Sequence, residues 1–293
     1  MSPELDGYTA KTYRYLRLGM VTLLFLLGSS VLIEWAHTAS RCFQTSISAY
    51  YYTPAQAVFV GTLVSVGVCM IVLKGSTEWE DVLLNLGGML APVVALVPTP
   101  DRGTCFSTPG TQRDIAADVA NNIPALFVTG LVGVGLTAAI AHWDGRREGR
   151  GRDYHHGVGI GVALAVLIGG FAWFALSRET FIEHAHYGAA FPLFGSIVAV
   201  VLLNARGYGR RTTGVTRPRE VYRNRYSGIA VLMVVLPVGM WLASRVVAWD
   251  HVVLWIEATL LVLFATFWVF QTQELWTEGV RSAAPPPPRT SRR

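Results

Sequence analysis

The sequence has little charge. Only 15% of its 293 residues are Asp, Glu, Lys or Arg, whereas roughly a quarter of the residues in soluble domains are charged. Hydrophobic residues make up 52% of the chain, and the mean hydropathy is +0.40. The few charges form short patches between long uncharged runs, a pattern typical of membrane spans joined by loops. This composition excludes an ordinary soluble domain.

Cysteine is scarce as well, and several signature motifs are missing. The chain has three cysteines and no Cys-x-x-Cys pair, so a disulfide-dense scaffold and a thiol-redox motif are excluded. No P-loop, dinucleotide fingerprint or Gly-x-Ser-x-Gly elbow occurs. The Ser-x-x-x-His and His-x-x-x-His spacings of the alkaline ceramidase and adiponectin-receptor zinc hydrolases are absent, so membership of that superfamily is not predicted.

Long apolar runs dominate what is present, and they predict an all-α polytopic integral membrane protein. The bundle of about eight transmembrane helices is expected over 18–272, after a polar cytoplasmic segment at 1–17 and before a disordered cytoplasmic tail at 273–293. The first run is too long for a signal peptide and lacks a small-residue cleavage site, so we expect it to be retained. The predicted spans are 18–36, 55–73, 82–97, 123–142, 157–176, 184–205, 227–247 and 251–270.

Basic residues give this bundle an orientation. Eight spans place 19 of the 24 Lys and Arg residues on the side of the two termini, which the positive-inside rule assigns to the cytoplasm. We therefore expect a multi-pass protein of a bacterial plasma membrane with both termini inside. The arginine-rich segment 206–226 is expected to touch anionic lipid headgroups. A nucleic-acid partner is rejected, although the pI is near 9.3, because the basic residues fall in alternate loops.

Two cysteines lie in loops on the predicted outer side. Cys42 follows the first span and Cys105 follows the third. That side is oxidising, so a disulfide between them is one interpretation and two free thiols is the other. A bridge would fix the loop that contains Tyr50–Tyr52, a run typical of an interfacial aromatic belt.

Ionisable groups at membrane depth indicate where chemistry could take place. Glu34 and His37 are three residues apart, as are Glu183 and His186, and both pairs fall at the outer end of a span. Residues three apart share a helix face, so each pair could present a carboxylate and an imidazole together. Two such motifs are ligands of the di-metal site in ferritin-like bundles. The sequence therefore offers Glu34, His37, Glu183 and His186 as ligands of a divalent metal.

Three function hypotheses follow from these groups. The first is a membrane enzyme or metal-binding protein at the outer leaflet, with Glu183, His186, Glu257 and Asp250 in the reaction. The second is a transporter of a small solute or lipid, in which Glu257 and Asn85 mark a path through the bundle. The third is a non-catalytic scaffold or sensor, whose outer carboxylates and imidazoles are merely hydrated or paired with arginine.

Several short stretches resemble a group of bacterial multispanning proteins. They are Ser46-Ile-Ser-Ala-Tyr-Tyr-Tyr-Thr, Phe59-Val-Gly, Lys74-Gly, Asn85-Leu-Gly-Gly and Pro98-Thr. Together they are similar to the DUF998 and Frag1/DRAM-like membrane families, mainly over the first three spans. The resemblance implies a helical membrane protein, and it implies no particular activity.

Overall fold

The computed structural model describes residues 3–38, 41–101, 103, 105, 115–148, 154–213 and 221–281. Over these residues the chain is helical, with no β-strand. Seven of the helices are long and apolar enough to cross a membrane. The elements are α1 (Pro3–His37), the 3-10 helix η1 (Ser48–Tyr52), α2 (Gln56–Val72), α3 (Glu78–Leu96), α4 (Ile115–Glu148), α5 (Tyr154–Leu176), α6 (Arg178–Thr213), α8 (Arg225–Ser244) and α9 (Val252–Glu274).

All eight predicted spans are helices, and α2 is the short one. It has 17 residues, and at 1.5 Å per residue it covers roughly 26 Å, less than the ~30 Å hydrocarbon core. The 3-10 helix η1 lies just before α2 in the chain and leads to the first residue of α2. The prediction of a multi-pass helical membrane protein is therefore confirmed at the level of seven long apolar helices with a shorter apolar helix among them.

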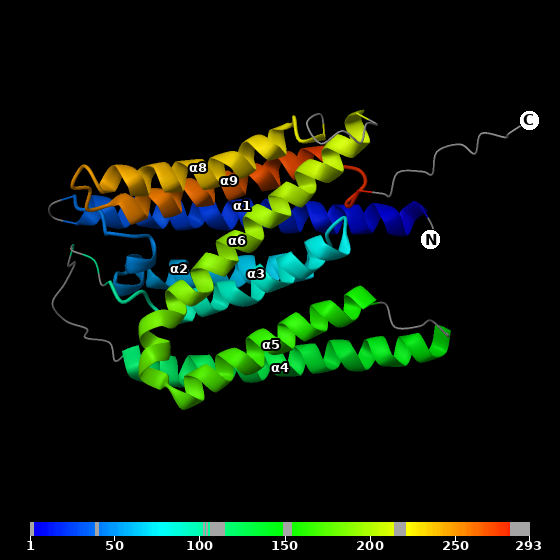
Figure 1. Ribbon diagram of the computed structural model, residues 1–293, viewed down its shortest axis with the longest axis horizontal. Helices are drawn as coiled ribbons and strands as arrows, with labels where there is room; N and C mark the ends of the chain where they lie inside the picture. The colour runs from blue at the N-terminus through cyan, green and yellow to red at the C-terminus, as the bar shows by residue number, and fades with distance from the viewer. Residues whose placement is uncertain are drawn as a thin grey trace, which may run out of the picture.

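Six helices form a ring, and two more flank it. Around the ring, α1 contacts α2, α2 contacts α3, α3 contacts α6, α6 contacts α8, α8 contacts α9, and α9 returns to α1. Figure 1 shows α4 and α5 as a pair on the side of α3 that faces away from α9. The ring has two ends, which we call the disulfide end, near Cys42, and the termini end, near Pro3 and Arg281.

The contact between α2 and α3 depends on glycine. A Cβ on Gly67 of α2 would lie 2.6 Å from the carbonyl oxygen of Gly88 on α3, and a Cβ on Gly88 would lie equally close to the oxygen of Gly67. Without side chains at these two positions, the two backbones can approach closely, as small residues allow in membranes. This contact fixes α2 against α3 beside the interior of the ring.

The boundaries of several elements differ from the prediction. α6 begins at Arg178, so residues 178–183 are helical and not a link between spans. α4 begins at Ile115, eight residues before the predicted span. α1 runs without a break from Pro3, because the predicted polar segment 1–17 continues the same helix. Helices extend beyond their apolar runs because backbone hydrogen bonding does not stop at the edge of the bilayer.

The structure describes residues 273–281, the first part of the predicted tail. Arg281 is only 8% exposed and Gln271 is 2% exposed, so this end of the chain is packed against the bundle. Residues 282–293 lie outside the described part of the chain. Polar partners from other helices explain this packing, and they are described below.

Candidate functional site

A cavity of about 70 Å³ lies inside the ring, bounded by α1, α2, α3, α6, α9 and the start of η1. One water needs at least about 10–15 Å³, so the cavity has room for several waters or a short alkyl group. Its wall is mostly hydrophobic, with Phe59, Met70 and Leu193 among the lining side chains. Among the described residues that line it, Glu257 is the only ionisable one.

Glu257 is held by the N-terminus of η1. Its Oε2 accepts hydrogen bonds from the backbone N–H groups of Ile47 at 2.6 Å and Ser48 at 3.3 Å, and its Oε1 accepts one from the Ser48 hydroxyl at 3.0 Å. Backbone N–H groups at the start of a helix lack partners within that helix, so a carboxylate there is stabilised. A carboxylate has about four acceptor sites, so these three bonds leave one free for a ligand.

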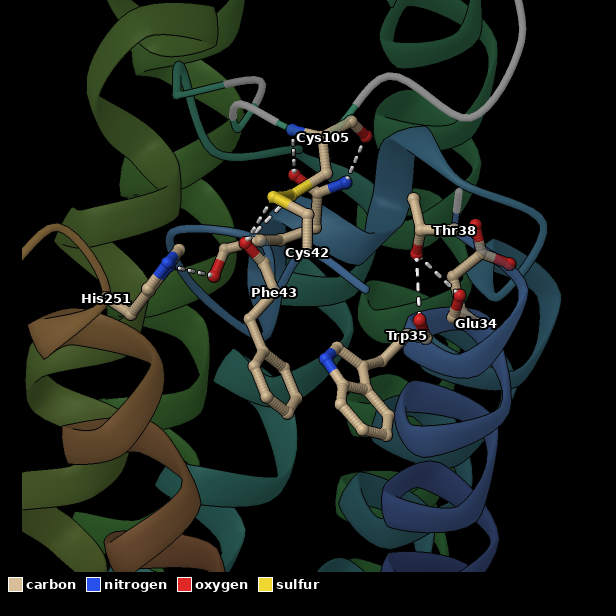
Figure 2. The surroundings of a disulfide bond; sticks show 8 residues. Glu34, Trp35, Thr38, Cys42, Phe43, Cys105 and His251 are labelled. Atoms are coloured by element: carbon tan, nitrogen blue, oxygen red, sulfur yellow. Dashed lines mark hydrogen bonds between the residues drawn. A yellow bond between two sulfur atoms is a disulfide. The ribbon is translucent and has the colours of Figure 1, made fainter. Parts of the chain in front are cut away.

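Residues 41–53, which we call the disulfide cap, close the cavity at this end. Cys42 and Cys105 form a disulfide, with their Cα atoms 5.8 Å apart. Gln44 reinforces it, because its Nε2 donates to the Cys105 carbonyl at 2.6 Å. Figure 2 shows the bridge beside Phe43, whose ring stacks on Trp35 of α1 with centroids 5.3 Å apart. The predicted disulfide is thus confirmed, and it ties the disulfide cap to the segment before α4.

Helix α9 and the end of α3 hold the same cap from two further sides. The backbone N–H of Leu254 donates to the Thr45 carbonyl at 3.0 Å, and the Tyr52 hydroxyl donates to the Thr99 carbonyl at 2.7 Å. Tyr50 lies beneath these bonds with a side chain 1% exposed. Its burial raises the pKa of the phenol, and the neighbouring Glu34 carboxylate adds to the rise. The tyrosine run is therefore part of a packed cap rather than an interfacial belt.

The four predicted metal ligands are not brought together. His186 is 2% exposed, and its Nδ1 lies 2.7 Å from the Val97 carbonyl oxygen. Glu183, one turn earlier on α6, has a side chain 69% exposed. On α1 the order is reversed, with Glu34 at 8% exposure and His37 exposed. Side chains three residues apart point in directions that differ by about 300° around the helix axis. The edge of the buried face falls between these two directions, so one member of each pair is buried and the other is exposed.

The rest of the described chain has no metal site either. Among the residues that the structure describes, no group of three or more His, Cys, Asp and Glu side chains could hold a metal ion. The predicted divalent metal is therefore not supported. Asp250, which the enzyme hypothesis groups with Glu257, is exposed and lies before α9, which begins at Val252. Asn85 is not among the residues that line the cavity.

A buried polar network lies across the termini end of the ring. Asn204 of α6 is at its centre: its Nδ2 donates to Glu80 at 2.5 Å, and its Oδ1 accepts from Gln271 at 2.7 Å and from Arg281 at 2.7 Å. Arg281 also donates to both oxygens of Glu274 at 2.7 Å. We call these five residues, together with Arg17 of α1, the polar network; Arg17 is 2% exposed. The network joins four helices.

The sequence interpretation missed this network. Asn204 falls at the end of a predicted span and Gln271 just after another, and polar groups at that depth were the available signal. Arg17 and Arg281 were counted only as orientation charges. Their convergence could not be seen because they are separated by most of the chain.

Comparison with known proteins gives this chain no family. No protein-family model, no curated protein and no solved structure matches it. The resemblance of the first three spans to the DUF998 and Frag1/DRAM-like families therefore stays a prediction, and the function must be argued from the site alone.

Proposed function

We propose that this protein is a membrane carrier that binds a small, mainly apolar molecule in the cavity between its two ends. The observation that carries the proposal is the position of the cavity. It lies inside the ring, with the disulfide cap at one end and the polar network about two helical turns beyond its lining at the other. A molecule bound there lies between the two ends of the bundle, as the substrate of a carrier does.

The charge of the cavity favours a cationic head on the ligand. Glu257 is the only ionisable residue among the described residues of the wall, and a carboxylate in low-dielectric surroundings attracts a nearby cation strongly. Its remaining acceptor site suits a ligand N–H. A protonated alkylamine combines such a donor with an apolar body. We therefore assign the ligand to this class, with the head at Glu257 and the alkyl part toward Met70.

The enzyme and scaffold hypotheses are less well supported. The predicted outer Glu and His side chains do not converge, and among the described residues no group of His, Cys, Asp and Glu could hold a metal ion, so the enzyme hypothesis loses its proposed ligand set. A scaffold would need neither an internal cavity nor a buried carboxylate. Both features are costly in a membrane bundle and are expected where they serve binding.

The carrier is proposed to lie in a bacterial plasma membrane with its disulfide end outside. The support is the excess of Lys and Arg on the side of the termini, 19 of 24, together with the Cys42–Cys105 bridge, which persists in an oxidising compartment. The arginines of that side are expected to contact anionic lipid headgroups. One-sided reporters fused to each terminus test this orientation, which a reporter active outside would contradict.

Thermal unfolding of the purified protein tests the ligand class. Butylammonium, butanol and butyrate share one alkyl chain and differ in the charge of the head. Butylammonium should stabilise the protein, by about 2.7 kcal/mol at 100 times its dissociation constant, and butyrate should not. Glu257→Gln should abolish the preference for the amine while leaving the shape of the cavity nearly unchanged.

A cavity-filling variant provides the matched control. Ala190→Phe places a ring in the cavity wall and should remove the stabilisation by every compound. Ala139→Phe places the same ring on an exposed face of α4 and should not. The proposal is wrong if no amine stabilises the protein, or if Glu257→Gln and Ala190→Phe leave the shift unchanged.

A further inference from the structure

The segment after α9 crosses the termini end of the ring. We call residues 275–281 the C-terminal strap, and Figure 1 shows it in red beside α1. Leu275 at its start is fully buried, and Trp276 lies against the Arg14 guanidinium of α1 at 4.5 Å. On the opposite side Glu278 pairs with Arg211 of α6. The strap therefore spans the ring from α1 to α6.

Gly279 lets the strap turn down into the bundle. Its φ is +75°, a conformation that residues with a Cβ rarely adopt, and a Cβ there would lie 3.1 Å from Cα of Ala10. The turn points the Gly279 carbonyl inward, where it accepts a hydrogen bond from Nη2 of Arg17 at 2.6 Å. The strap is thereby fixed to α1 through its backbone.

Arg281 ends the strap inside the polar network. Its guanidinium bonds Glu274 and Asn204, and its backbone N–H donates to the Ser76 hydroxyl at 3.2 Å. Ser76 belongs to the turn between α2 and α3. One residue therefore connects three parts of the ring, through its guanidinium and its backbone N–H rather than through a continuous helix.

The strap stands between the cavity and this end of the molecule. The cavity lining reaches Ile197 on α6 and Phe264 on α9, and Asn204 and Gln271 each follow seven residues later, about 10 Å along the helix. Within the part of the chain that the structure describes, the strap continues the backbone of α9, and it is held to α1 and α6 by hydrogen bonds and side-chain contacts. It can leave without displacing any helix of the ring.

The charges of the network allow a second arrangement. Arg17 is attracted by Glu80 and repelled by Arg281, yet the hydrogen bonds of Glu80 go to Asn204 and Ser76. When Arg281 leaves, Arg17 loses both the Gly279 carbonyl and the repulsion, and the attraction by the Glu80 carboxylate remains. Two alternative pairings of the same groups are what a two-state element needs.

We propose that the C-terminal strap is the gate of the cavity at the termini end and that Arg281 is the residue that holds this gate closed. The inference rests on the proposed function, since it concerns access to the same cavity. In the closed state Arg281 pairs with Glu274. In the open state the strap is displaced, Arg17 pairs with Glu80, and the cavity is reached from the side of the termini.

Thiol labelling from one side tests the gate without any ligand. A reporter thiol is introduced as Ile197→Cys in a Cys69→Ser background, because Cys69 is the one free cysteine of the chain. A charged, membrane-impermeant thiosulfonate is added to membrane vesicles of either orientation. Arg281→Ala should increase the labelling rate from the termini side on the order of tenfold or more, since removing one partner of a buried ion pair strongly destabilises the arrangement.

Controls separate a gate from general loosening. Labelling from the disulfide side should not change, whereas a bundle that has merely lost packing would label faster from both sides. Arg206→Ala removes an exposed arginine of α6 and should leave the rate unchanged, and Arg281→Lys should give an intermediate rate. The gate is refuted if Arg281→Ala labels like the parent or labels faster from both sides. Because no ligand is used, that result would leave the binding test of the carrier unaffected.

Discussion

Removal of the Cys42–Cys105 bridge should destabilise the protein by an amount that depends on the number of residues in the loop it closes. The two cysteines are separated by 63 residues, and closing such a loop in the unfolded chain is worth about 4 kcal/mol in the chain-entropy model. In a membrane α2 and α3 remain helical when the tertiary structure is lost, so the flexible part of the loop is shorter. Because each halving of the loop changes the term by only about 0.6 kcal/mol, we expect a loss of about 3–4 kcal/mol.

The assay is unfolding by a denaturing detergent, followed by the fluorescence of the nine tryptophans. The double variant Cys42→Ser/Cys105→Ser should unfold at lower detergent, and dithiothreitol should bring the parent to the same curve. Cys69→Ser is the matched control and should not shift the unfolding curve. The reasoning fails if the reduced parent, shown by mass to carry free thiols, unfolds as the oxidised protein does.

Three other predictions follow from single positions. Glu257→Ala leaves the Ile47 N–H without its acceptor and should cost about 1–3 kcal/mol in free energy of unfolding, with Glu257→Gln costing less. Equal losses would contradict a stabilising role for the hydrogen bonds between Glu257 and η1. Gly67→Ala places a methyl 2.6 Å from a carbonyl oxygen and should cost about 1–3 kcal/mol, whereas Gly133→Ala, which meets nothing within 4 Å, should not destabilise in the same assay. Burial raises the pKa of Tyr50, so its contribution to stability is complete below the unfolded pKa of about 10 and is lost as the pH rises further. Unfolding measured at about pH 9 and pH 11 should therefore show an alkaline loss that Tyr50→Phe reduces, and an identical loss in both proteins would refute this account.

The disulfide and the Glu-x-x-His pairs show which contacts a local sequence pattern can predict and which it cannot. Cys42 and Cys105 were matched because topology placed both on one side of the membrane, and only two partners were available there. Glu183 and His186 were grouped because three residues is a helical spacing, but spacing fixes an angle about the helix axis and not the direction of the neighbouring helix. α3 lies against His186 and leaves Glu183 exposed, which no count along α6 could reveal.

By itself, the sequence determined the helices, because a run of apolar residues in a bilayer must satisfy its backbone within its own segment. Only the tertiary structure decided which ionisable groups meet. The Glu257 carboxylate is stabilised by N–H donors that η1 supplies. Arg281 can be buried because Glu274 and Asn204, on other parts of the fold, accept its hydrogen bonds. Hydropathy is a sum over neighbours in the chain, whereas a buried charge is stabilised by partners across the fold, and those contacts depend on how the helices pack.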